Sequence, residues 1–189
     1  PGVDCTKKMV TALRKLGFHA IFDTNLGADF TIVEEANEFI ERLKKNKNLP
    51  IITSCSPGWI NFMEKFYPEL IPNASSCKSP MMMVSSLIKT YYAKKIKKDP
   101  KDIFVVAIMP CVAKKYEIER KESYLDGLKL TDAVLTTREA TLMIKSYGID
   151  FKKLKDSNFD APLGESTGAA DIFGTTGGVM EATLRTAYE

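Results

Sequence analysis

The stretch IFVVAIMPC, residues 103–111, is the most apolar strand candidate in the chain. A continuous run of β-branched and aliphatic residues is typical of a strand that is buried on both faces of a parallel sheet. Pro110 and Cys111 end this run, and a helical pattern follows over 112–120. A strand followed by a helix is the unit that builds parallel sheets with helices on both faces. The stretch therefore favours an α/β fold.

The same alternation of helix and strand extends along the chain, without an internal repeat or a low-complexity linker. Predicted helices occupy 5–16, 29–43, 57–67, 80–98, 112–120, 138–147 and 179–188, and predicted strands occupy 19–22, 49–53, 103–109 and 133–136. The second helix is expected to begin at Asp29 or Thr31, and the third after Ser56, which acts as its N-cap. These elements predict parallel sheets with flanking helices.

The composition is that of a globular chain. Its 189 residues are 44% hydrophobic and 27% charged, which argues against disorder, collagen and a coiled coil. No apolar run approaches the ~18 residues of a membrane span, and the N-terminus lacks a signal-peptide pattern. The net charge of +3 combines 27 basic and 24 acidic residues scattered along the sequence, which argues against nucleic acid as a partner. We expect a soluble, cytoplasmic protein.

The four cysteines are widely spaced and form no CxxC motif, which argues against a disulfide framework or a zinc knuckle. Cys55 and Cys111 each follow an apolar strand and precede a helix, where ligands bind in parallel sheets. A helix N-terminus lowers the pKa of a thiol and favours the thiolate, which ligates soft metals or attacks electrophiles. The alternative is equally open from position alone: both are small buried residues at strand ends.

Two further patterns carry weaker signals. Gly174, Gly177 and Gly178 suggest a phosphate loop, but no strand precedes them and their spacing does not match a dinucleotide fingerprint. The run 81–83 consists of three methionines at successive helical positions, for which core packing is the expected role and cofactor contact the minority alternative.

Two motifs resemble a known family. TSCSPGW at 53–59 and MPCVAKKYE at 109–117 resemble, in order and separation, the first two signature motifs of the iron-only (FeFe) hydrogenase catalytic domain. The resemblance continues through FDTN at 22–25, GAD at 27–29, SSCKSP at 75–80 and IFGTTGGVMEA at 172–182. It therefore covers essentially the whole chain.

The resemblance implies a two-lobed domain of parallel sheets that holds the H-cluster, a four-iron cubane joined through a cysteine to a two-iron subsite with carbon monoxide, cyanide and a bridging dithiolate amine. This cofactor reversibly combines protons and electrons to hydrogen, and the electrons are exchanged with ferredoxin or NAD(P)-linked subunits. By the same resemblance Cys111 and Ser56 match the positions of cubane ligands. The positions expected to contact the cofactor are Ser79, Met81, Met109, Pro110, Lys114, Phe173 and Gly174, among which Lys114 and Ser79 donate to the cyanides.

The resemblance also implies a proton path through Cys55, Glu35, Ser75, Glu38 and Arg42. Cys55 would exchange protons with the bridging amine. The spacing agrees in part with this path, because Glu35, Glu38 and Arg42 fall at positions i, i+3 and i+7 and so lie on one helix face. An exposed ion-pair stripe, worth well under ~1 kcal/mol, is the alternative for those three residues.

The chain departs from the family pattern in ways that limit the site. Ser56 stands where the family commonly has a second adjacent cysteine, and Met81 where many relatives have glutamine. Serine binds iron more weakly than a thiolate. The family's first strand would precede Pro1, and the third motif, with two more cubane ligands, would follow Glu189. We therefore expect residues 1–189 to be a partial catalytic domain that is without cofactor and inactive on its own.

Three other functions stay open. A sensory hydrogenase-like domain is the first, because Ser56 and Met81 alter the surroundings of the cluster. An iron-sulfur assembly protein of the same fold is the second, although Cys55 and Lys114 count against it. A generic α/β nucleotide-binding domain is the third.

Overall fold

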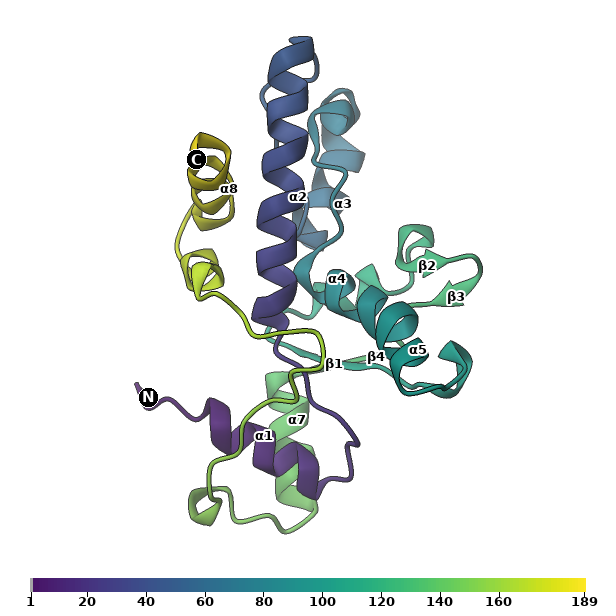
Figure 1. The fold of residues 1–189 in the computed structure, drawn as a ribbon, viewed down its shortest axis with the longest axis vertical. Helices are drawn as coiled ribbons and strands as arrows, with labels where there is room; N and C mark the ends of the chain where they lie inside the picture. The colour runs from purple at the N-terminus through teal and green to yellow at the C-terminus, as the bar shows by residue number, and fades with distance from the viewer. Residues whose placement is uncertain (1) are drawn as a thin grey trace.

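The computed structural model describes residues 2–189, and Figure 1 shows the long helix α2 (Thr24–Lys45) between α8 (Gly178–Tyr188) on one side and α3 and α4 on the other. The other α-helices are α1 (Thr6–Lys15), α3 (Pro57–Phe66), α4 (Pro80–Leu87), α5 (Ala93–Lys95), α6 (Ala113–Glu117) and α7 (Thr137–Ser146). A π-helix, η2, spans Ile88–Tyr92, and 3-10 turns are η1 (Pro68–Asn73), η3 (Pro100–Asp102), η4 (Lys121–Ser123), η5 (Phe151–Lys153) and η6 (Ala169–Gly174).

The predicted parallel sheet is present as one pair of strands. β1 (Val106–Met109) runs parallel to β4 (Ala133–Thr136), with Val106 opposite Ala133 and Met109 opposite Thr136. The strand predicted over 103–109 is thus shorter than expected. The α/β class is confirmed as a helix-rich fold with a small parallel sheet.

Two predicted strands were wrong. At 19–22, only Ile21 is paired: its N–H donates to Asp160 Oδ2 at 2.8 Å, and its carbonyl accepts from the Asp160 N–H at 2.8 Å. At 49–53, only Ile52 forms a bridge, with Ala74. A strand is defined by a ladder of bonds to a neighbour, so an apolar run that meets one partner residue stays irregular.

Helix boundaries also differ from the prediction. α2 begins at Thr24 because the Asp23 carboxylate caps it and accepts from the Asn25 N–H at 2.9 Å. The helix expected over 80–98 is divided into α4, η2 and α5, and Lys97 follows it with a left-handed φ of 54°. α6 ends at Glu117 rather than at residue 120. The N-caps Ser56 for α3 and Thr136 for α7 accept from backbone N–H groups, as such residues do at helix starts.

A short hairpin was not predicted. β2 (Tyr124–Leu125) and β3 (Leu128–Lys129) are antiparallel and joined by Asp126 and Gly127, both with positive φ. Asp-Gly is a strong sequence signal for this two-residue turn, so the pattern could have revealed the hairpin.

The core that supports the site lies between α4 and the sheet. Met81 and Met82 are buried there with Ala107, Leu130 and Val134, which confirms core packing for two of the three consecutive methionines. α2 packs against both α4 and α8. This position directs one face of α2 towards the chain around residue 75. Within residues 2–189, no helix has the length and apolar character to cross a bilayer.

The contact between α2 and α4 depends on Gly27. A Cβ atom at this position would lie 2.2 Å from the Pro80 carbonyl oxygen and 2.7 Å from Val84 Cγ2. Gly27→Ala is therefore expected to separate the two helices and to lower the free energy of unfolding by about 2–3 kcal/mol, measured by urea denaturation. Gly58→Ala in α3 is the control, because its Cβ would meet no atom within 4 Å. Equal stabilities of the two variants would contradict the prediction.

Candidate functional site

Glu38 joins α2 to the segment around residue 75. Its Oε1 accepts from Arg42 Nη2 at 2.6 Å, and its Oε2 accepts from Ser75 Oγ at 2.9 Å and from the Ser76 N–H at 3.0 Å. Arg42 also donates to the carbonyls of Asn73 and Ala74. Burial opposes the charged form of Glu38, but these hydrogen bonds outweigh it, and the pKa of Glu38 is lowered. The side chains of Arg42 and Glu38 are only 13% and 17% exposed, so they do not form an exposed stripe.

Glu35 lies one turn before Glu38 on α2 and is 1% exposed. Its Oε2 accepts from Thr183 Oγ1 of α8 at 3.4 Å, whereas its Oε1 is buried without a hydrogen-bond partner. Burial raises the pKa of Glu35, because loss of water penalises the carboxylate more than nearby hydroxyl groups favour it. A carboxyl group in this setting holds a proton more readily than an exposed glutamate does.

Cys55 and Cys77 are partly buried thiols near these acids. Burial, and then the charge of Glu35, raise the pKa of Cys55, so the expectation that the helix start would favour its thiolate was wrong. Burial likewise raises the pKa of Cys77 to about 11, and its Sγ lies 3.8 Å from Glu38 Oε2. Among residues 2–189, no direct hydrogen bond joins Cys55 to Glu35.

Lys114 and Ser79 meet at one carboxylate. Ser79 Oγ donates to Glu117 Oε1 at 2.5 Å, and Lys114 Nζ lies 2.6 Å from Glu117 Oε2. Lys114 Nζ also donates to the Cys55 carbonyl at 2.8 Å, which connects α6 to the chain before α3. Two shielded donors, one of them cationic, form a set that suits an anionic acceptor such as cyanide. Glu117 is not among the residues predicted from the sequence, although its i,i+3 spacing from Lys114 could have indicated this pair.

The two expected cubane ligands have different surroundings. Ser56 Oγ accepts from the Trp59 N–H at 3.4 Å and caps α3, while Cys111 is exposed between β1 and α6. In the part of the chain from residue 2 to residue 189, no group of three His, Cys, Asp or Glu side chains is placed to hold a metal ion. The ligand roles of Ser56 and Cys111 stay predictions.

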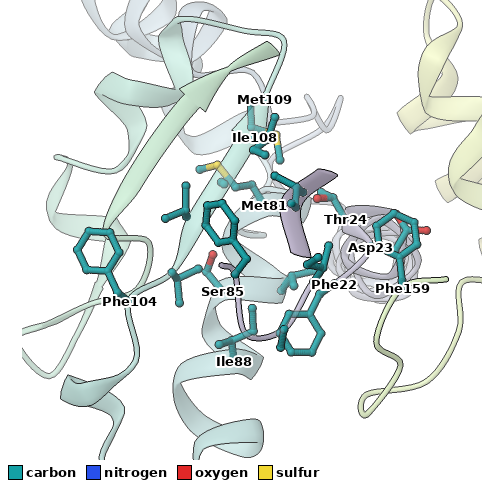
Figure 2. Close-up of a pocket in the computed structure, with 18 of the residues that line it drawn as sticks. Phe22, Asp23, Thr24, Met81, Ser85, Ile88, Phe104, Ile108, Met109 and Phe159 are labelled. Atoms are coloured by element: carbon teal, nitrogen blue, oxygen red, sulfur yellow. The ribbon is translucent and has the colours of Figure 1, made fainter. Parts of the chain in front are cut away.

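The residues expected to form the wall of the cofactor site are divided between two places. Met81 and Met109 line an apolar pocket of about 290 Å³ between residues 18–24, α4 and β1, shown in Figure 2, and no cysteine lines it. Pro110 is exposed just beyond β1. Phe173 and Gly174 belong to η6 and do not line this pocket. The contacts of Met81 that the structure shows are core contacts.

The glycine-rich segment before α8 has a packing role. A Cβ atom on Gly178 would lie 1.8 Å from the Ile172 carbonyl oxygen, so η6 folds back directly onto the start of α8. This close approach accounts for Gly178 without a phosphate ligand.

Comparison with known proteins identifies the family and the fold. The model of the iron-only hydrogenase large subunit, C-terminal domain, matches residues 1–189. The periplasmic Fe hydrogenase large subunit of Nitratidesulfovibrio vulgaris is 55% identical over 186 residues, which are 97% of this chain and 44% of the relative. The structure of the apo FeFe-hydrogenase of Chlamydomonas reinhardtii is 47% identical with a TM-score of 0.86, over 97% of this chain and 47% of that one.

A more distant relative is a cytosolic Fe-S cluster assembly factor of Xenopus tropicalis, 34% identical over 196 residues, with 98% of this chain and 41% of the relative covered. The chain thus spans less than half the length of each of these three proteins. The identity is higher to the hydrogenases than to the assembly factor. Since the family model covers every residue and the similarity to its members is this high, the chain belongs to the family of the iron-only hydrogenase large subunit.

Proposed function

We propose that this chain supplies part of the catalytic domain of a hydrogenase that interconverts molecular hydrogen with protons and electrons. The observation that carries the proposal is the shielded series of proton-binding and hydrogen-bonding groups on α2 and the neighbouring segment: Glu35, Ser75, Glu38 and Arg42. Such groups can pass a proton over several ångströms through an otherwise apolar interior. The H-cluster, when bound, supplies the redox chemistry.

Each residue of the series has a separate task in this proposal. Cys55 accepts or returns the proton at the cofactor, and Glu35, whose charge acts on the Cys55 thiol, is the next group in the series. Glu35 holds the proton, as its raised pKa favours. Ser75 connects to Glu38, and Arg42 keeps the Glu38 carboxylate in place at the outer end.

Lys114 and Ser79 would hold the cyanide ligands by charge-assisted and neutral hydrogen bonds, and Glu117 would keep both donors oriented when cyanide is absent. Cys111 would contribute one thiolate to the cubane. Ser56 would stand at the position of a second ligand, and the two ligands of the family's third motif are not among residues 1–189, so we propose that this chain alone is without cofactor and inactive.

The test uses a chimera in which residues 1–189 replace the matching segment of the Nitratidesulfovibrio vulgaris large subunit. After anaerobic maturation, the chimera is expected to evolve hydrogen from a reduced artificial electron carrier, whereas the isolated chain treated in the same way evolves none. Cys111→Ala in the chimera is expected to remove four-iron cluster signals in electron paramagnetic resonance. A chimera with full iron content and no hydrogen evolution would overturn the proposal.

The electron partner and the location belong to the proposal as well. We propose ferredoxin or an NAD(P)-linked subunit as the electron partner, and the cytoplasm as the location. The name of one relative places that protein in the periplasm, so sequence similarity within the family does not decide the location. Cell fractionation with an antibody against α2 would distinguish the two compartments.

A further inference from the structure

Thr183 of α8 reaches the proton series from the opposite side of α2. It is fully buried, and its Oγ1 lies 3.4 Å from Glu35 Oε2 and 2.9 Å from the Val179 carbonyl oxygen. The other hydroxyl of the series, Ser75, donates to Glu38 at 2.9 Å. Ser75 thus uses its proton on Glu38, whereas Thr183 has no contact with Glu38 and can donate to Glu35.

The position of this hydroxyl suits both protonation states of Glu35. A hydroxyl has one proton to donate and two lone pairs to accept with. When Glu35 is ionised, Thr183 donates to Oε2. When Oε2 carries the proton, it donates to Thr183 Oγ1, which turns its own proton to the Val179 carbonyl. The Glu35 carboxyl group thus keeps a partner in either state, although its Oε1 has none.

We propose that Thr183 is a positioning residue of the proton series, which holds the Glu35 carboxyl group and sets the pH at which Glu35 releases its proton. The catalytic meaning of this proposal rests on the proposed function, whereas the contact itself exists without the cofactor. The result is a link from α8 to a proton-binding side chain on α2, two helices that pack against each other.

The charged and titratable groups around Glu35 are few. Glu38 is on the same helix and is paired with Arg42, and the thiols of Cys55 and Cys77 approach from the segments before α3 and α4. α4 carries no charged residue, Asp171 of η6, which also packs against α2, is exposed, and Glu181 and Arg185 of α8 are exposed and paired with each other. The Ser75 hydroxyl also favours the Glu35 carboxylate, but its single proton is donated to Glu38 at 2.9 Å, so it does not replace Thr183.

The test compares the wild-type 189-residue chain with Thr183→Val and Thr183→Ser by infrared titration of the protonated carboxyl band. The Glu35→Gln variant identifies which part of that band belongs to Glu35. Thr183→Val keeps the shape and removes the hydroxyl, so the ionised form loses a donor. Because a donor favours the charged carboxylate, its loss is expected to raise the titration midpoint of Glu35 by about one pH unit. Thr183→Ser retains the hydroxyl and is expected to keep the midpoint within a few tenths of a unit of the wild-type value.

An unmoved midpoint in Thr183→Val, with wild-type circular dichroism, would overturn the proposal. So would an equal rise in Thr183→Ser, since lost packing would then explain it. If Thr183→Val does not fold, Thr183→Ala also removes the hydroxyl and is expected to raise the titration midpoint of Glu35 in the same way. The titration is made without cofactor, so an inactive chimera would overturn the proposed function and leave this result intact. An unchanged titration midpoint would overturn only the role proposed for Thr183 and would leave the proposed function untouched.

Discussion

Glu38→Gln is expected to lower the rate of hydrogen evolution by the chimera about 10²–10⁴-fold, the usual range for loss of a proton-transferring side chain. Glutamine retains the shape of Glu38 and has one oxygen that can still accept from Arg42, but its amide nitrogen faces Ser75 as a donor, and it cannot take up and release a proton. The measurement is hydrogen evolution at saturating reduced carrier, with the rate expressed per bound cluster. Expressing it this way separates proton transfer from assembly.

Glu41→Gln supplies the matched control on the same helix. Glu41 pairs with Lys45 at 3.0 Å, and both side chains are about two-thirds exposed, so this pair lies outside the shielded series. The control is expected to retain the full rate. If Glu38→Gln retained it too, protons would reach the cofactor by another route, and the assignment of the series would fail.

The sequence predicted best those elements that depend on short-range chemistry. Pro57 after Ser56 predicted the start of α3, and the i, i+3 and i+7 spacing predicted a shared face for Glu35, Glu38 and Arg42. By contrast, whether Ile21 or Ile52 belongs to a strand depends on which segment lies beside it. An apolar run indicates burial but does not identify its neighbour.

The parts of the site that sequence reasoning missed are long-range contacts. Thr183 meets Glu35 across 148 positions of the chain, and no local pattern identifies it as a partner. The pKa of Cys55 was predicted in the wrong direction for the same reason. The helix start was visible in the sequence, but burial and the charge of Glu35, which outweigh it, come from tertiary packing.

Lys89 is the residue whose removal should cost the chain the most stability. It is 2% exposed in the π-helix η2, and its Nζ lies 2.9 Å from Asp132 Oδ2. The ammonium also donates to the carbonyls of Pro100 and Ile103, while Asp132 Oδ2 accepts from the Val105 N–H at 2.7 Å. This one side chain therefore ties η2 to the starts of both β1 and β4.

Lys89→Ala is expected to lower the free energy of unfolding by about 3–5 kcal/mol, because it removes the only cation paired with the shielded Asp132 carboxylate among the described residues and a donor to two carbonyl groups. Urea denaturation measures this loss, and Lys94→Ala, which removes an exposed lysine nearby, is expected to stay within about 0.5 kcal/mol of wild type. Equal stability of the two variants would show that Lys89 does not hold the sheet. β1 leads directly into Pro110 and Cys111, so a loosened start of this strand would also reduce cluster binding in the chimera. This effect is expected even though Lys89 does not contact the residues of the candidate site.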